Sequence, residues 1–223
     1  FIKKTNKKDY DDLSKLEILS KYWVKSQNNI EIEGDFQFLK THHACIKFHN
    51  YPFTTSTNTL GTIYLIRDPR DVVISYARHL GKDIDQTMNL MINRSATAVY
   101  NGERGNELKL YQSSWDFHVK SWERLGVPTL IIRYEDLLNN TKNILFALVD
   151  FFETNFEFKF NNLDEKIDNI IKSTTFDIFQ EHEKKYNFGE ASKHSKFFRK
   201  GIVGQWKNKL TANQIKIIES NFK

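Results

Sequence analysis

The sequence predicts an α/β fold in which a parallel sheet is flanked by helices. Residues 62–66, TIYLI, form a β-branched and aromatic run that is typical of a sheet interior. Residues 129–134, TLIIRY, form a second apolar run of this kind, and each run leads into a helical pattern. Strands that alternate with helices are typical of parallel sheets, so these observations together indicate this fold class.

The helix expected after residues 62–66 has its own start and stop signals. Asp68 can cap the N-terminus, and Pro69 fits the first helical position because its missing N–H costs nothing there. Asp71 adds a carboxylate to the positive end of the helix dipole, and Gly81 suits the left-handed position beyond the last turn. One apolar face is formed by Val72, Val73, Tyr76, Ala77 and Leu80.

The segments around this strand and helix give weaker signals. Residues 9–25 have apolar side chains at helical spacing, and residues 36–40 are a short apolar run that predicts a strand. Residues 50–61 are rich in Thr, Ser and Asn and predict a loop. Residues 82–112 show no clear period, apart from a turn expected at residues 102–105.

The last third of the chain is predicted to be mostly helical. A helix is expected over about residues 141–152, and residues 184–200 mix charges and glycine without a period, which predicts a mobile loop. The expected caps are Ser114 for a helix that ends at Gly126, Asn162 with Glu165 for a helix that ends near Ser173, and Thr211 with Gln214 for the last helix.

Composition limits the class of protein. With 223 residues, 39% of them hydrophobic, the chain can bury the core of a single domain, 1–223. The net charge of +5 is mild and spread along the chain, so it favours an anionic ligand without arguing for nucleic acid. Cys45 is the only cysteine, which fits a reducing, cytoplasmic location. No apolar run reaches membrane length, and no histidines fall in a metal-ligand spacing.

Arg67 and Ser75 form a candidate phosphate site. Arg67 lies at the carboxyl end of the predicted strand, where open α/β sheets bind ligands, and Ser75 lies two turns into the helix. A guanidinium offers a planar fork of donors to an anion, and a hydroxyl adds one more. The alternative is an Arg67 that pairs with Asp68 or Asp71 and a solvated Ser75.

Residues 62–81 resemble one of the two cofactor signatures of the PAPS-dependent sulfotransferases. These enzymes transfer a sulfuryl group from 3′-phosphoadenosine 5′-phosphosulfate (PAPS), and in them an Arg and a Ser eight positions apart hold the 3′-phosphate. Residues 199–208, RKGIVGQWKN, resemble the second signature, although Gln205 stands where the family usually has Asp. The resemblance implies a P-loop nucleotide-kinase-like fold, PAPS as the co-substrate and no metal.

The resemblance also implies roles for further residues. In the family pattern the 3′-phosphate is surrounded by Arg67, Ser75, Arg199, Lys200 and Gly201. The adenine is contacted by Tyr134, Thr174 and Phe176. From the residues alone, Arg199 and Lys200 could equally be a solvated basic pair, and Tyr134 could be an ordinary core residue.

His42, in the run Lys40-Thr41-His42, matches the histidine that takes the acceptor proton in this family. Imidazole suits that task because its pKa lies near the working pH. Lys40 is expected to donate to the transferring group, and the adjacent His43 is expected to point elsewhere. The alternative for His42 is a structural or surface histidine.

The same resemblance predicts that part of the catalytic machinery lies outside this sequence. The family has a strand, a phosphate-cradling loop of the PKSGTTW kind and a helix ahead of the position of Phe1. We therefore interpret the chain as a fragment, incomplete at its N-terminus, and expect it to be catalytically inactive or nearly so. A family dimer element aligns with residues 207–216 but has lost its Val and Glu, so a monomer is favoured.

The predicted function is transfer of a sulfuryl group from PAPS to a hydroxyl of a small-molecule or carbohydrate acceptor, or to an amine, without a membrane or nucleic-acid partner. Two alternatives remain open. A small-molecule kinase of the P-loop type would share the fold but needs a Mg²⁺-binding carboxylate. A non-enzymatic basic module that binds nucleotides or RNA should have one continuous basic stripe with interleaved aromatic residues.

Overall fold

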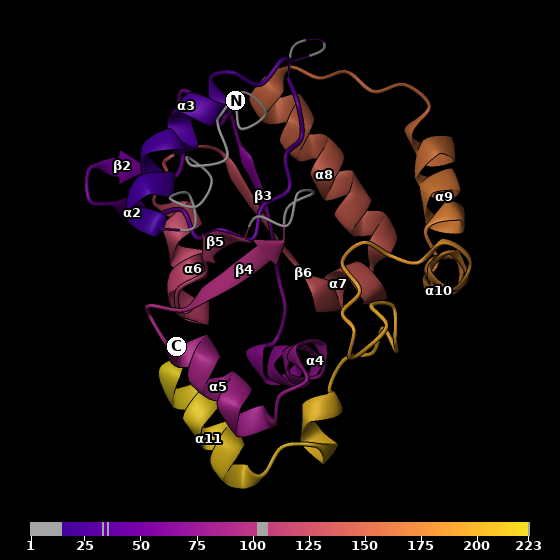
Figure 1. Cartoon of the computed structure of the whole chain (residues 1–223). Coiled ribbons are helices and arrows are strands. Elements are labelled where there is room, and N and C mark those ends of the chain that lie inside the picture. Colours follow the sequence, from indigo (N-terminus) through magenta and orange to yellow (C-terminus); the bar gives the residue numbers. More distant parts are fainter. Residues whose placement is uncertain (1–14, 33, 35, 102–106, 223) are drawn as a thin grey trace. The chain divides into compact units, whose positions relative to one another are not determined.

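The structure, a computed structural model, describes residues 15–32, 34, 36–101 and 107–222 (Figure 1). The chain divides into two compact units. Unit 1 comprises Phe1–Thr62 and Met91–Thr129, and unit 2 comprises Ile63–Leu90 and Leu130–Lys223. The interpretation of residues 1–223 as a single domain stays a prediction.

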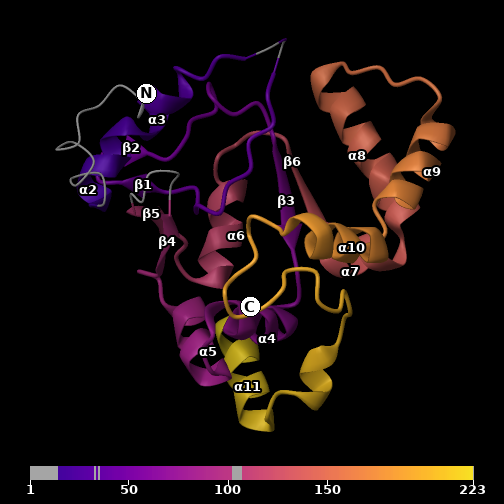
Figure 2. The same ribbon diagram turned by 45° about the vertical axis from the view of Figure 1, so that its right-hand side comes forward.

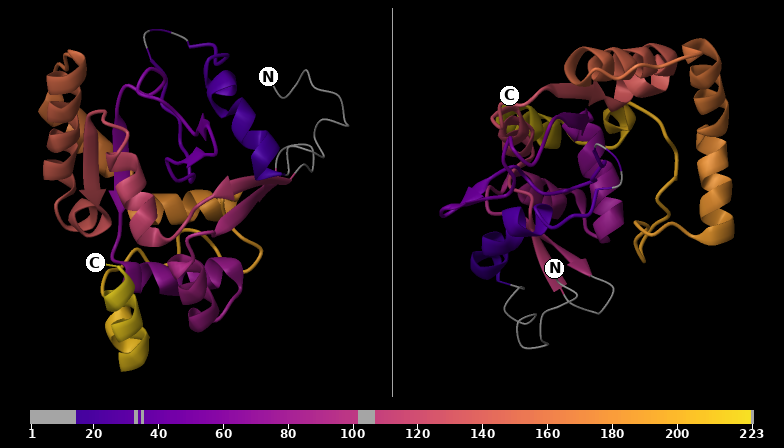
Figure 3. Two further views of the ribbon diagram at one scale, coloured as in Figure 1. Left: turned by 90° about the vertical axis from the view of Figure 1, so that its left-hand side faces the viewer. Right: turned by 90° about the horizontal axis from the view of Figure 1, so that it is seen from above.

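Unit 1 contains short helices and two antiparallel strand pairs. Its elements are α2 (Leu16–Leu19), η2 (Ser20–Tyr22), α3 (Trp23–Gln27), β1 (Lys47–Phe48), β2 (Tyr51–Pro52), β4 (Thr97–Asn101), β5 (Glu107–Tyr111) and α6 (Trp115–Glu123). Strands β4 and β5 lie side by side (Figure 3), with Thr97 opposite Tyr111. The consecutive helical segments from Leu16 to Gln27 confirm the described part of the helix expected over residues 9–25.

One expected strand is absent, and two ranges without an expected strand or helix contain such elements. Residues 36–40 form no strand, since no described strand pairs with them, and Phe38 and Leu39 are largely exposed. The loop expected over residues 50–61 contains β2, and the patternless range 82–112 contains β4, β5 and a helix. The turn expected at residues 102–105 lies outside the described residues.

His43 lies in the core of unit 1. Its side chain is 1% exposed, its ring stacks on Phe53 at 4.3 Å, and the edge of Trp23 meets it at 4.7 Å. The His43 Nδ1–H donates to the Ala44 carbonyl at 2.8 Å, and the Trp122 indole donates to the His43 carbonyl at 3.1 Å. Burial lowers the pKa of His43 to about 4, so the ring is neutral at neutral pH.

Unit 2 is built on two strands with helices around them. Its elements are β3 (Thr62–Ile66), α4 (Pro69–Leu80), α5 (Ile84–Ile92), β6 (Thr129–Arg133), α7 (Tyr134–Asn139), α8 (Thr141–Phe156), α9 (Leu163–Ser173), α10 (Phe176–Tyr186), η3 (Gln205–Asn208) and α11 (Ala212–Asn221), with a few end residues counted in unit 1. Strands β3 and β6 are neighbours in a parallel sheet, and α4 and α7 begin at the same end of these strands (Figure 2). The predicted α/β class with a parallel sheet is confirmed.

The helix signals of the sequence have mixed outcomes. The Asp68 carboxylate accepts from the Arg70 N–H at 2.9 Å, Gly81 has φ +64°, and Thr211 forms the expected capping box. Two expected caps are wrong. Asn162 has φ +56° and no side-chain cap, while the Ser114 hydroxyl donates to the Asp116 carboxylate at 2.7 Å instead. Both side chains lack the geometry in which an oxygen faces the free N–H groups of the first turn.

Helix α10 was not predicted, and three residues of the expected mobile loop, 184–186, belong to it. The Thr175 hydroxyl caps this helix by accepting from the Ile178 N–H at 3.4 Å. Helix α8 also continues four residues beyond its predicted end, to Phe156.

The burial of His43 predicts acid sensitivity of the fold. The ordinary pKa of 6.5 in the unfolded chain exceeds the folded value of about 4, so stability is fully present above pH 6.5 and falls as the pH drops toward 4. Over this pH range the free energy of unfolding should fall by about 3 kcal/mol. Urea unfolding of the wild type and of His43→Phe at pH 7 and 4.5 measures it, with the exposed His182→Gln as control. Equal losses in wild type and His43→Phe would contradict the assignment.

Candidate functional site

Arg67 links the two signature segments within unit 2. It directly follows β3, its guanidinium donates to the Ile202 carbonyl at 2.9 Å, and it lies over the Tyr134 ring at 4.5 Å. Its Nε is buried and, among the described residues, has no hydrogen-bond acceptor. An unpaired buried donor is costly, so Arg67 has a strong donor available for a ligand.

Asp71 anchors the second signature to helix α4. Its side chain is 0% exposed, and its two oxygens accept from the Gly204 N–H at 2.6 Å and the Trp206 N–H at 3.1 Å. The Arg70 guanidinium lies over the Trp206 ring at 3.8 Å. Sequence reasoning gave Asp71 a helix-dipole role and a possible pairing with Arg67, and it missed this anchor. The available signal was the position of Asp71 one turn before Ser75 on the same helix face.

Gly201 is in a position that only glycine fits. Its φ is +59°, and a Cβ added there would lie 2.7 Å from the Phe176 ring. Phe176 is the first residue of α10, and its ring meets Phe198 edge-on at 6.2 Å. The absence of a side chain therefore lets an aromatic ring approach the backbone of the signature turn.

Helix α10 fixes the residues that lead into this turn. The Glu183 side chain is 5% exposed, and its oxygens accept from the Phe197 N–H at 2.7 Å and the Phe198 N–H at 3.0 Å. The Gln180 amide donates to the carbonyls of Phe198 at 2.9 Å and Arg199 at 3.1 Å. Sequence reasoning missed both anchors because it did not predict this helix.

Arg199 lies within electrostatic reach of other cations. Its guanidinium donates to the Gln205 side-chain oxygen at 3.1 Å, so Gln205 braces the turn where the family usually has Asp. Burial lowers the pKa of Arg199, and the nearby Arg78 and Arg67 lower it further. In the described parts of the chain, no carboxylate lies within 4.0 Å of these three guanidinium groups. Such a cluster favours an anion.

The remaining predicted cofactor residues, Ser75, Thr174 and Lys200, differ in environment. Ser75 on α4 and Lys200 in the turn are both exposed. The Thr174 hydroxyl donates to the Ile170 carbonyl at 2.6 Å, at the end of α9. Thr174 thus uses its hydroxyl for a bond to α9, whereas the Ser75 and Lys200 side chains are exposed to solvent.

The two predicted catalytic residues belong to unit 1, whereas the eight cofactor residues belong to unit 2. Lys40 and His42 are exposed in an irregular segment. The His42 carbonyl accepts from the Nε2–H of His118 on α6 at 3.3 Å, and burial lowers the pKa of His118. His118 was not predicted as a partner of His42.

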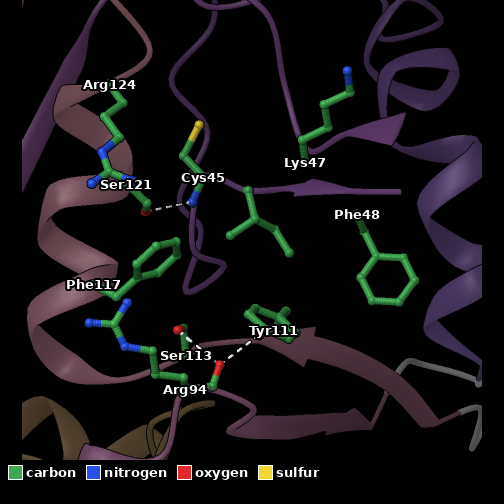
Figure 4. A pocket seen from close by; sticks show the side chains of 10 residues that line it. Cys45, Lys47, Phe48, Arg94, Tyr111, Ser113, Phe117, Ser121 and Arg124 are labelled. Carbon is green, nitrogen blue, oxygen red and sulfur yellow. Dashed lines mark hydrogen bonds between the residues drawn. The ribbon is translucent and has the colours of Figure 1, made fainter. Parts of the chain in front are cut away.

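Unit 1 also contains an open cavity of about 390 Å³ (Figure 4). The Phe117 ring lies between the guanidinium groups of Arg94 at 5.3 Å and Arg124 at 5.7 Å. The cavity is further lined by Cys45, Ile46, Lys47, Phe48, Tyr111, Ser113 and Ser121. The range 82–112 contributes Arg94 and Tyr111 to this lining, and the range 50–61 contributes no lining residue. This basic and aromatic lining suits a planar or anionic small molecule.

The described residues show neither a candidate metal site nor a candidate membrane span. Within the described ranges, no group of three or more His, Cys, Asp or Glu side chains could hold a metal ion. None of the helices in that part of the chain has the length and apolarity needed to span a bilayer.

Comparison with known sequences gives one consistent result. Residues 4–223 match the profile of the family described as the sulfotransferase domain. Sulfotransferase 1B1 of Mus musculus is 29% identical over 195 residues, which cover 84% of this chain and 60% of the relative. Sulfotransferase 1B1 of Canis lupus familiaris is 33% identical over 165 residues, or 70% of this chain and 51% of the relative. The chain thus spans between half and two thirds of these relatives.

Solved structures give the same fold. A mouse sulfotransferase complexed with PAP, the desulfated cofactor, has a TM-score of 0.56 at 21% identity, covering 79% of this chain and 62% of that one. A retinol dehydratase in complex with androsterone and PAP has a TM-score of 0.50 at 23% identity, covering 71% of this chain and 45% of that one. At these identities the likeness shows the fold alone.

The Asp71 anchor predicts a large effect from a small substitution. Asp71→Asn keeps the size of the side chain but turns an amide N–H₂ toward a backbone donor, so one buried N–H loses its acceptor. We expect a loss of about 2–4 kcal/mol in the free energy of unfolding. Urea denaturation measures it, with the exposed Asp150→Asn on α8 as the matched control. A loss no larger than that of the control would show that Asp71 is not an anchor.

Proposed function

Because the chain belongs to the sulfotransferase family, we propose that it transfers the sulfuryl group of PAPS to a hydroxyl, or less readily an amine, of a small-molecule acceptor. One observation carries the proposal. Segments more than 130 residues apart meet in unit 2, where Arg67 bonds to Ile202 and Asp71 bonds to Gly204. Both segments supply the residue types that a phosphate monoester needs.

The fit to a 3′-phosphate is supported by the free donors of this region. Arg67 has a buried Nε without a described acceptor, and Ser75 presents an exposed hydroxyl on the neighbouring helix. Arg199 and Lys200 add two cations, and Gly201 permits close backbone approach. These groups would bind the two negative charges of the phosphate and orient the nucleotide.

The adenine is proposed to bind against aromatic side chains. Phe176 offers a flat apolar surface beside the signature turn, and Tyr134 lies under the Arg67 guanidinium. Stacking on such rings favours planar heterocycles. Thr174 is the weaker member of this set because its hydroxyl already donates to Ile170.

For the chemical step, His42 is proposed as the general base and Lys40 as a donor to the transferring group. The acceptor oxygen forms a bond to sulfur, the bond from sulfur to the 5′-phosphate oxygen breaks, and the acceptor proton passes to the His42 imidazole. The products are a sulfate ester and PAP. His43 does not fit this role, since it is 1% exposed and its Nδ1 is bonded within the core.

Acceptor choice is proposed only as a class. Relatives include an amine sulfotransferase of Oryctolagus cuniculus and a 3-beta-hydroxysteroid sulfotransferase of Cavia porcellus. The cavity beside Phe117 has arginines on either side of the ring. It favours a small aromatic or acidic acceptor over one that is neither aromatic nor acidic. The cytoplasmic location and the monomeric state stay predictions.

Binding of PAP is the first test of the proposal. Isothermal calorimetry with PAP should give a saturable isotherm without metal, and Mg²⁺-ATP should compete weakly. Tighter binding of Mg²⁺-ATP than of PAP would favour the kinase alternative instead. Salt-sensitive binding of RNA that PAP does not displace would favour the non-enzymatic module.

The predicted inactivity of this chain is tested by comparison with a longer one. Addition of a strand, a PKSGTTW-like loop and a helix ahead of Phe1 should raise transfer from PAPS, because backbone amides of such a loop stabilise charge on the leaving phosphate. Equal PAP affinity and equal transfer by the two chains would contradict this prediction.

The role of His42 predicts a selective loss of turnover. In a chain extended as above, His42→Ala should lower kcat by about 10²–10⁴ and leave the PAP dissociation constant unchanged. His49→Asn is the matched control, since His49 is exposed with φ +50° and Asn tolerates that conformation. Retention of most of kcat in His42→Ala would remove it from the mechanism.

A further inference from the structure

One face of helix α4 runs along the loop that carries the second signature. Asp71, Ser75 and Arg78 are spaced i, i+4 and i+7, so they share this face. At one end, Asp71 accepts from the Gly204 N–H. At the other end, a Cβ on Gly81 would lie 2.7 Å from the His194 ring. Helix α4 thus lies close to the loop near both of its ends.

Arg78 lies between these two contacts. The loop residues between His194 and Gly204 include Arg199, Lys200 and Gly201, and Arg199 lies within electrostatic reach of Arg78. Helical side chains tend to lean toward the N-terminus, which for the half-buried Arg78 is the direction of the turn that contains Ser75. Arg78 is therefore within electrostatic reach of one residue of the proposed phosphate site, Arg199.

The charge around Arg78 is uncompensated in the described part of the chain. No described carboxylate lies within 4.0 Å of Arg67, Arg78 or Arg199, and the carboxylate of α4, Asp71, is bonded to backbone N–H groups. Arg78 contributes more than Arg67 to the lowered pKa of Arg199. Like charges held this close repel one another, and a bound dianion would relieve the repulsion.

We infer that Arg78 is a third arginine of the 3′-phosphate site and binds the phosphate together with Arg67 and Arg199. The inference rests on the proposed function, because it assumes that a 3′-phosphorylated nucleotide is the ligand. A third guanidinium adds a planar fork of donors for a dianionic phosphate. Its consequence is stronger discrimination for PAPS and PAP over adenosine 5′-nucleotides that lack the 3′-phosphate.

The test compares Arg78→Gln with the matched control Lys82→Gln, an exposed cation four residues further along. Calorimetry with PAP and with adenosine 5′-monophosphate (AMP) is run on the wild type and both variants. Arg78→Gln should weaken PAP binding by about tenfold or more and change AMP binding by less than about twofold. Arg78→Lys should lie between wild type and Arg78→Gln, since it keeps the charge but loses the fork. Lys82→Gln should match the wild type with both nucleotides.

The outcomes separate this inference from the proposed function. If the wild type and Arg78→Gln bind PAP equally well, the inference is overturned and the proposed function still stands. Equal weakening of PAP and AMP also overturns it, because Arg78 would then act on the whole nucleotide or on the fold. Wild type that fails to bind PAP overturns both. Circular dichroism checks folding, and if Arg78→Gln is unfolded the comparison of Arg78→Lys with wild type decides.

Discussion

The buried Asp71 carboxylate is the contact on which the rest of the candidate cofactor site depends. A buried charge is tolerated only when it is well bonded, and Asp71 accepts from two backbone N–H groups at the positive end of α4. These bonds bring the signature turn against the helix that carries Ser75. Arg67 then lies in one region with Arg199 and Gly201, although more than 130 residues separate it from them.

Local signals predicted much of unit 2. The strand at residues 62–66 and the helix from Pro69 to Leu80 follow from side-chain type, from the Asp68 cap and from Gly81, all of which act within a few residues. The strand prediction for residues 36–40 was wrong because an apolar run becomes a strand only when a neighbour pairs with it. Strands β4 and β5 were missed for the converse reason, since their pairing with each other compensates for a weak local pattern.

Short motifs nominated ligand residues such as Arg67 and Gly201, whose role stays a proposal. Glu183, which holds the residues before the turn, and Arg78, the proposed third arginine, depend instead on which helix face meets a distant loop. No local pattern contains that information. His43 gives the same lesson, because its core position is created by Trp23, Phe53 and Trp122 from three separate segments.

Hydrogen exchange of the Gly204 and Trp206 amides, followed by NMR, tests the central contact most directly. If Asp71 holds the signature turn, both amides should exchange far more slowly than an unstructured peptide, as do hydrogen-bonded amides inside α4. Protection should disappear selectively in Asp71→Asn while amides within α10 keep theirs. Exchange of both wild-type amides at the unprotected rate would contradict the account.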